Sequence, residues 1–173
     1  TPEAVRTIAP VLDAINVDLK AFRDQTYRDV MKARLAPVLE CLETLVGEGV
    51  WVEVTTLVVP GMNDSDEELR DIAGFIAGKL GPDVPWHVSR YHDDYEMNGR
   101  GSTPIATIER AERIGREAGL HYVYRGNVAA GADTSCPGCG AVVVSRAPFG
   151  LKTNRLAGGA CPQCGRAIPG IWA

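Results

Sequence analysis

Long hydrophobic runs are absent from this sequence. The 173 residues contain no apolar run near the roughly 20 residues that cross a membrane, and no secretory signal peptide stands at the start. We therefore expect neither a membrane protein nor a secreted one, and we expect a cytoplasmic location. A glycine-rich phosphate loop and the motifs of nucleophile–base–acid hydrolases are also absent. The chain starts without methionine, in what reads as a helix capped by Thr1, so we expect further residues upstream.

The net charge of −4 is small but unevenly distributed. Residues 134–173 carry four basic side chains and no acidic one, so this tail is +4 and the first 133 residues carry −8. Four metal-bound thiolates and one divalent ion would leave the tail at +2. So weak a field does not favour a nucleic-acid partner.

The first 125 residues alternate between strand-like and helix-like segments. Short β-branched or apolar runs mark the strands, and apolar residues at helical spacing mark the helices. The expected helices span residues 1–11, 36–49, 65–81 and 103–119, and the expected strands span residues 14–19, 50–59, 86–89 and 120–127. This alternation is typical of an α/β fold with a parallel sheet and crossover helices.

Four parallel strands make either an open sheet or the second half of a (β/α) barrel. Polar residues at the strand ends favour the barrel, because parallel α/β folds build their sites there. A small, polar linker around residues 127–135 suggests two parts, an α/β domain of residues 1–130 and a tail of residues 131–173. Cys41 stands alone in an apolar helical pattern and is interpreted as a small buried hydrophobe.

The other four cysteines form two matched Cys-Pro-x-Cys-Gly knuckles in the tail. Cys136 and Cys139 are separated by 21 residues from Cys161 and Cys164. Two close pairs on tight turns suit a tetrahedral zinc site, and iron in a rubredoxin-like site is the alternative. Because the protein would fill all four positions, we expect this metal to be structural.

The residues around the knuckles predict a zinc-ribbon-like module. Gly140 and Gly165 follow the second cysteine of each pair, where a left-handed backbone would aim N–H groups at the sulfurs. The segment between the pairs, residues 141–156, is expected to supply a hairpin.

Two strands carry polar side chains that an apolar sheet does not need. Asp18 and Lys20 share one face at the end of the first strand, where they would grip a zwitterion or a cation, or form a plain surface ion pair. Glu53 and Thr55 share one face of the second strand. A carboxylate inside an apolar strand must be paired or must face a polar cavity.

The third strand and the loops add fewer candidates. Ser89 lies on the third strand, and His92 lies just past its end, beside a long polar loop of residues 91–102. After the second strand, residues 63–65 are expected to cap the next helix, with Ser65 and Glu68 as a capping box.

Taken together, several segments resemble a known family. They are LDAINVDLKAF, ARLAPVLECLETL, VWVEVTTLVVPGMNDSDEELRDIAGFI, PWHVSRYH and the two CPxCG knuckles. Over essentially the whole chain, they resemble the radical S-adenosylmethionine (SAM) enzymes of the AmmeMemoRadiSam system, which are similar to pyruvate formate-lyase activating enzymes. The knuckles are the more specific mark of this group.

The resemblance implies a fold, cofactors and a reaction. The implied fold is the C-terminal half of a partial, TIM-like (β/α) barrel followed by the zinc-ribbon-like tail. The implied cofactors are SAM and a 4Fe-4S cluster. Reductive cleavage of SAM would give a 5′-deoxyadenosyl radical that abstracts hydrogen from a protein or small-molecule substrate. A protein substrate or other proteins of the system are the implied partners.

The resemblance also implies roles for the polar residues. Asp18 and Lys20 would line the amino-acid end of SAM, and Thr55, with Glu53 less firmly, would face the same cavity. The adenine end would meet His92 and the backbone of Ser89, although SRYH departs from the family's LPYH at its first two positions.

One family motif is missing. The cluster-binding C-x3-C-x2-C triplet does not occur in this chain, so its ligands are expected upstream of Thr1 and the chain alone is expected to be inactive. A non-catalytic module of α/β domain and zinc ribbon, which recruits a protein or nucleic-acid partner, is the alternative function.

Overall fold

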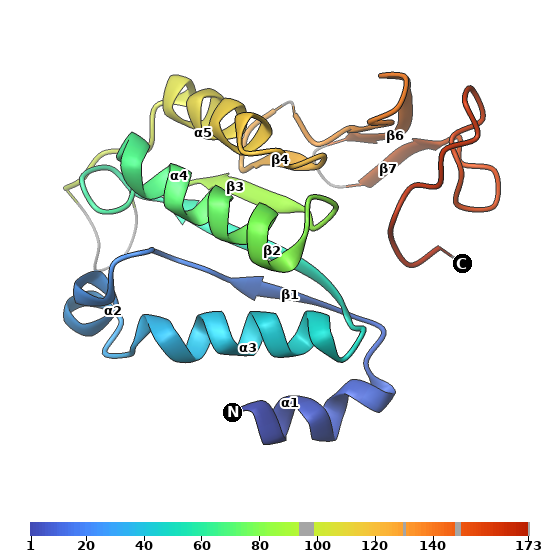
Figure 1. Ribbon diagram of the computed structural model, residues 1–173. Helices are drawn as coiled ribbons and strands as arrows, with labels where there is room; N and C mark the ends of the chain where they lie inside the picture. Colours follow the sequence, from blue (N-terminus) through green and yellow to red (C-terminus); the bar gives the residue numbers. More distant parts are fainter. Residues whose placement is uncertain (94–98, 130, 148–149, 173) are drawn as a thin grey trace.

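The computed structural model describes residues 1–93, 99–129, 131–147 and 150–172 (Figure 1). In chain order the elements are α1 (Pro2–Ile8), η1 (Ala9–Val11), β1 (Ala14–Asp18), α2 (Asp24–Val30), α3 (Leu35–Gly47), β2 (Trp51–Val58), α4 (Asp66–Phe75), η2 (Ile76–Leu80), β3 (Trp86–Arg90), α5 (Ile105–Glu117), β4 (Val123–Gly126), β5 (Thr134–Ser135), β6 (Val142–Ala147) and β7 (Gly150–Asn154). Among the described residues, no helix is long and apolar enough to cross a membrane.

The expected parallel sheet is confirmed. Strands β1 to β4 lie in sequential order and every neighbouring pair is parallel. Within the described residues this sheet is open, with β1 and β4 at its edges. The structure therefore shows a four-stranded sector and does not show a closed barrel. Strands β5 to β7 form a separate antiparallel sheet in the tail, and β6 and β7 are the expected hairpin.

In the described part of the chain, helices cover one face of the parallel sheet and leave the other uncovered. Figure 1 shows α3, α4 and α5 packed along it, with α1 beside α3. Side chains of β2 alternate strictly between buried and half-buried, so one face belongs to the core. The core is mostly aliphatic, but Thr56 is fully buried in it: its hydroxyl donates to the Leu19 carbonyl at 2.8 Å and accepts from the Trp86 indole at 2.9 Å.

The structure adds one helix and changes one capping interaction. The short α2 has a polar sequence without apolar periodicity, and it is anchored by the buried Tyr27, whose hydroxyl accepts from the Lys20 N–H at 3.2 Å. Ser65 caps α4 as expected, accepting from the Glu68 N–H at 3.2 Å. The other half of the capping box, a hydrogen bond from the Ser65 N–H to the Glu68 side chain, was predicted wrongly. The Glu68 carboxylate instead accepts from the Phe22 N–H at 2.6 Å.

Asn63 holds the ends of β1 and β2 together instead of capping a helix. Its side chain is buried, and its amide nitrogen donates to the carbonyls of Lys20 at 2.6 Å and Leu57 at 2.8 Å. Its amide oxygen accepts from the Val59 N–H at 2.7 Å. Both the nitrogen and the oxygen of this amide are therefore hydrogen-bonded, and these bonds fix the loop that follows Asp18.

Replacing Asn63 by alanine should destabilise the fold by about 2–4 kcal/mol, because two carbonyls and one N–H would lose their partner in a buried place. Urea unfolding followed by circular dichroism measures this loss. The matched control is Asn154→Ala. Asn154 lies in the exposed strand β7, and its side chain accepts a single hydrogen bond, from the Leu156 N–H. Equal stabilities of the two variants would contradict the role given to Asn63.

Candidate functional site

Side chains on the uncovered face of the sheet form three rows across the strands. Parallel register places them side by side: Asn16 with Glu53, then Asp18, Thr55, His87 and Tyr124, then Leu57, Ser89 and Gly126. The rows follow one another from the N-terminal toward the C-terminal ends of the strands. Most of the polar candidates from the sequence therefore stand on one face.

Glu53 is paired, as a carboxylate in an apolar strand must be. Its side chain lies 2.7 Å from Nε2 of His87 and accepts from the Trp51 indole at 3.3 Å. The hydrogen bond from His87 is the main reason that the pKa of Glu53 lies below its usual value; burial opposes this shift, and Trp51 and Arg146 add to it. Glu53 is therefore an ionised hydrogen-bond acceptor at neutral pH.

Asp18, Lys20 and Thr55 lie nearer the C-terminal ends of the strands. Lys20 and Asp18 form an ion pair of 3.1 Å, with about half of each side chain exposed. So exposed a pair adds little stability and leaves both charges accessible to a ligand. Thr55 lies beside Asp18 in the register, and its hydroxyl donates to Asn16 Oδ1 at 2.9 Å.

Ser89 and His92 are less closely joined to this group. Ser89 packs against Gly126, where any β-carbon would overlap its hydroxyl, so β3 and β4 approach closely at this row. His92 lies exposed after the end of β3, and the described residues make no hydrogen bond to its ring. Part of the polar loop beside it, residues 94–98, lies outside the described residues.

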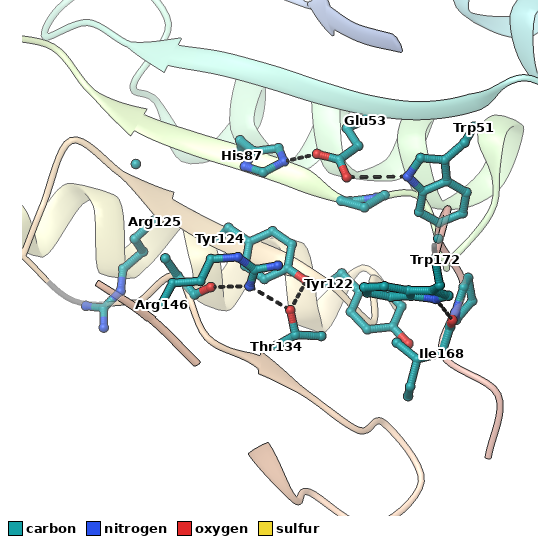
Figure 2. Close-up of a pocket in the computed structure, with 15 residues that line it drawn as sticks. Trp51, Glu53, His87, Tyr122, Tyr124, Arg125, Thr134, Arg146, Ile168 and Trp172 are labelled. Carbon is teal, nitrogen blue, oxygen red and sulfur yellow. Dashed lines mark hydrogen bonds and ion pairs between the residues drawn. The ribbon is translucent and has the colours of Figure 1, made fainter. Parts of the chain in front are cut away.

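A pocket of about 340 Å³ lies between the uncovered face and the tail (Figure 2). Its lining includes Trp51, Glu53, His87, Tyr124, Arg146 and Trp172. Figure 2 shows the side chains of β2 and β3 along one side and those of β4 and the tail along the other. The tail is thus one wall of a cavity whose other wall is the sheet.

Contacts at Tyr124 join the tail to the sheet. The Tyr124 ring stacks beside His87, with 5.2 Å between ring centroids, and the guanidinium of Arg146 lies 5.5 Å from its centroid. The Tyr124 and Thr134 hydroxyls are 2.9 Å apart, and Arg146 donates to Thr134 at 2.8 Å. Tyr122, the residue before β4, is buried in the hydrophobic cluster of the tail.

The four knuckle cysteines converge on one point. The Sγ atoms of Cys136, Cys139, Cys161 and Cys164 all lie within 4.8 Å of one another. Cys136 and Cys164 are 3.5 Å apart, and Cys139 and Cys161 are 3.7 Å apart. Zinc–sulfur bonds of about 2.3 Å in a tetrahedron place sulfurs about 3.8 Å apart, so the geometry fits a single tetrahedral ion.

The chemistry of the thiols also fits a cation. Burial opposes ionisation of Cys136, but the N–H groups of Gly138 and Cys139 and the neighbouring thiols outweigh it and lower the pKa of Cys136 to about 7. The Ala141 N–H favours a thiolate at Cys139, yet burial and the three nearby sulfurs raise its pKa to about 12. Four thiolates in so small a space need a cation among them.

The knuckles themselves have the expected backbone. Gly140 and Gly165 both have φ of +75°, and their N–H groups donate to the carbonyls of Cys136 and Cys161. The Gly138 N–H lies 3.4 Å from Cys136 Sγ, and the N–H of Ala141, directly after the left-handed Gly140, points at the sulfur of Cys139. The turns therefore form as expected.

Most pocket residues were not anticipated from the sequence, and three of them show why. His87 reads as a lone histidine, and only the register with β2 reveals its partner Glu53. Arg146 and Trp172 belong to the tail, which no local pattern places against the sheet. The one available signal was the unpaired carboxylate inside β2, which required some partner.

Comparison with curated proteins finds relatives longer than this chain. No protein-family model matches the chain. It is 42% identical over 161 residues to the uncharacterised protein MJ0808 of Methanocaldococcus jannaschii, covering 91% of this chain and 48% of that protein. It is 34% identical over 74 residues to the benzylsuccinate synthase activating enzyme of Thauera aromatica, covering 43% of this chain and 22% of that enzyme. The chain thus spans about half or less of the curated relatives it matches.

Solved structures share the fold. A domain of a pyruvate-formate lyase-activating enzyme from Bacteroides vulgatus matches with a TM-score of 0.63 at 15% identity, covering 72% of this chain and 74% of that one. A radical SAM methyltransferase from Sphaerobacter thermophilus matches with a TM-score of 0.61 at 19% identity, covering 76% of this chain and 41% of that one. The α/β fold with its parallel sheet is therefore one that radical SAM enzyme domains have.

Replacing His87 by phenylalanine should raise the pKa of Glu53 toward its usual value, because the ring would remain beside Tyr124 but the hydrogen bond would be lost. The stabilisation from a lowered carboxyl pKa is present above the pKa of the unfolded chain and is lost as pH falls through the folded value. Carboxyl ¹³C NMR of Glu53 measures the midpoint. His121→Phe, which removes the bond to Asp83, is the control; the same Glu53 midpoint in all three proteins would refute the pairing.

Replacing Cys161 by serine should abolish stoichiometric metal binding and remove amide protection from residues 134–172, because the tail is too small to fold around its own core. Elemental analysis and hydrogen–deuterium exchange measure the two effects. Cys41→Ser is the matched control, since Cys41 lies on α3 away from the cluster. Retention of one metal per chain by the Cys161 variant would exclude the four-cysteine site.

Proposed function

We propose that this chain is the C-terminal part of a radical SAM enzyme of the AmmeMemoRadiSam type, similar to activating enzymes. The observation that carries the proposal is the polar row on the uncovered face of β1 and β2, in a fold that radical SAM domains share. The sequence similarity to the activating enzyme of Thauera aromatica supports the same conclusion. The substrate would be a protein or a small molecule from which hydrogen is abstracted.

The charges at the end of β1 suit the amino-acid end of SAM. The Asp18 carboxylate would accept from the ammonium group, and the Lys20 ammonium would donate to the carboxylate. Thr55, beside Asp18, would add a hydroxyl to the same cavity. The adenine end would lie toward the backbone of Ser89 and toward His92, beyond the C-terminal end of β3.

Glu53 is a weaker candidate for this cofactor. It lies one row nearer the N-terminal ends of the strands than Thr55, and His87 and Trp51 already hold its carboxylate. We therefore assign Glu53 to the pocket beside the tail.

The 4Fe-4S cluster does not fit the residues of this chain. In such enzymes the cluster supplies the electron that cleaves SAM, but the C-x3-C-x2-C triplet that would hold it is missing here. The four knuckle sulfurs lie too close together for the separate irons of a cubane and suit one ion. The cluster ligands would come from the part of the longer relatives that this chain does not span.

For the knuckles we propose a structural zinc ion. Cys136, Cys139, Cys161 and Cys164 would fill its four positions, so no position remains for water or substrate. Zinc would stabilise the tail and thereby one wall of the pocket.

A protein of the length of the archaeal relative, purified without oxygen, should contain about one zinc and about four irons per chain and should cleave SAM when reduced. Elemental analysis and chromatography of 5′-deoxyadenosine measure both. Asp18→Asn should weaken SAM binding by about 10-fold, because a charged hydrogen-bond partner is lost. Asp13→Asn, an exposed aspartate just before the other end of β1, is the control.

Zinc without iron, even after reconstitution with iron and sulfide, would overturn the radical SAM proposal. A non-catalytic binding module would then remain. Iron in place of zinc at the knuckles would give a coloured protein, since a ferric tetrathiolate absorbs visible light.

A further inference from the structure

The lining of the pocket between the sheet and the tail is rich in aromatic rings. Two of the three tryptophans of the chain, Trp51 and Trp172, lie in its walls, together with Tyr122 and Tyr124. The Tyr124 ring is in contact with both His87 and Arg146. Among the described residues, Trp51 and Trp172 make no ring contact with each other, so both remain available to a ligand.

The Trp172 side chain is held in place by specific contacts, although it lies near the C-terminus. Its indole donates to the Ile168 carbonyl at 2.7 Å. Its ring packs so closely on Gly159 that a β-carbon there would overlap it, and a β-carbon at Gly170 would crowd it. Trp172 nevertheless stays 39% exposed and is part of the pocket lining. Burial of that remaining apolar surface favours a ligand with a flat, apolar face.

The charges of the pocket favour a neutral ligand. Glu53 contributes a carboxylate from β2, and Arg146 contributes a guanidinium from β6. Arg125, the other basic residue in the lining, is already ion-paired to Glu109 and Glu112 on α5. A ligand with a single charge of either sign would meet a like charge at Glu53 or at Arg146, whereas a neutral one would meet none.

The Glu53 carboxylate also determines which hydrogen-bonding group a ligand must carry. An ionised carboxylate only accepts hydrogen bonds and has about four acceptor sites, of which Trp51 and His87 occupy two in Glu53. A ligand that reaches Glu53 must therefore bring an O–H or N–H donor.

We propose that this pocket binds a neutral aromatic ring that carries a hydrogen-bond donor, a phenol or an indole, with the ring against Trp51 and Trp172 and the donor on Glu53. The ring comes either from a small molecule or from a tyrosine or tryptophan side chain of a polypeptide. The inference goes beyond the proposed radical SAM function, because binding needs neither SAM nor a cluster. It does need the tail, which supplies Trp172 and Arg146.

The three indole N–H groups allow a direct test by ¹H–¹⁵N NMR of the metal-loaded chain without SAM. Those of Trp51 and Trp172 belong to the pocket, whereas that of Trp86 donates to Thr56 in the core on the opposite face and serves as an internal control. Titration with N-acetyl-tyrosinamide should shift the signals of Trp51 and Trp172 and leave that of Trp86 unchanged. A parallel titration with 4-ethylphenol separates the two sources: equal binding indicates a free ring, and binding of the amide alone indicates a polypeptide residue.

Variants and a probe without a donor complete the test. Glu53→Gln should weaken binding by about 10-fold, because a hydrogen bond to a charged group is lost. Glu43→Gln, an exposed carboxylate on α3, should change nothing. N-acetyl-phenylalaninamide should bind about 10-fold more weakly than the tyrosine probe for the same reason. No shift at Trp51 and Trp172 up to the solubility of both phenols, or equal affinity in the Glu53 variant, would overturn the proposal.

Discussion

Side chains on the face of a sheet that no helix covers must find polar partners, a covering segment or a ligand. In this protein the helices cover one face, where even the polar Thr56 is buried, with hydrogen bonds to Leu19 and Trp86. On the other face, parallel register sets polar residues of β1, β2 and β3 side by side. Glu53 meets this need by pairing with His87. Asp18 and Lys20 meet it by pairing with each other while staying accessible to solvent and ligands.

At the β4 edge, the tail covers part of the face that the helices leave open. Tyr122 lies in the hydrophobic cluster of the tail, and Tyr124 meets Thr134 and Arg146. Thr134 stands two residues before Cys136, so the chain that contacts the sheet leads directly into the first knuckle. Four thiols within 4.8 Å of one another cannot all ionise without a cation. The proposed metal, by folding the tail, would therefore also complete the wall of the pocket.

Local patterns predicted the fold well and the site only in part. Strands, helix caps and knuckles depend on neighbours within a few residues, and β2, Ser65 and the Gly140 turn formed as expected. The failures involve partners far along the chain. Glu68 binds the N–H of Phe22, 46 residues away, and Asn63 binds the carbonyl of Lys20, 43 residues away. Such contacts depend on how helices set the spacing of strands, which periodicity does not encode.

The register also relates the two proposed sites. Glu53 and Thr55 lie two residues apart on β2 and point to the same face, which places their rows about 7 Å apart along the strand. A ring held at Glu53 would therefore lie next to a cofactor held at Asp18 and Thr55, without sharing its side chains. The tail stands on the side of Glu53, through Arg146 and Trp172. Loss of the knuckle metal would thus open the pocket first, while Asp18 and Lys20, which are positioned by Asn63 and α2, would keep their geometry.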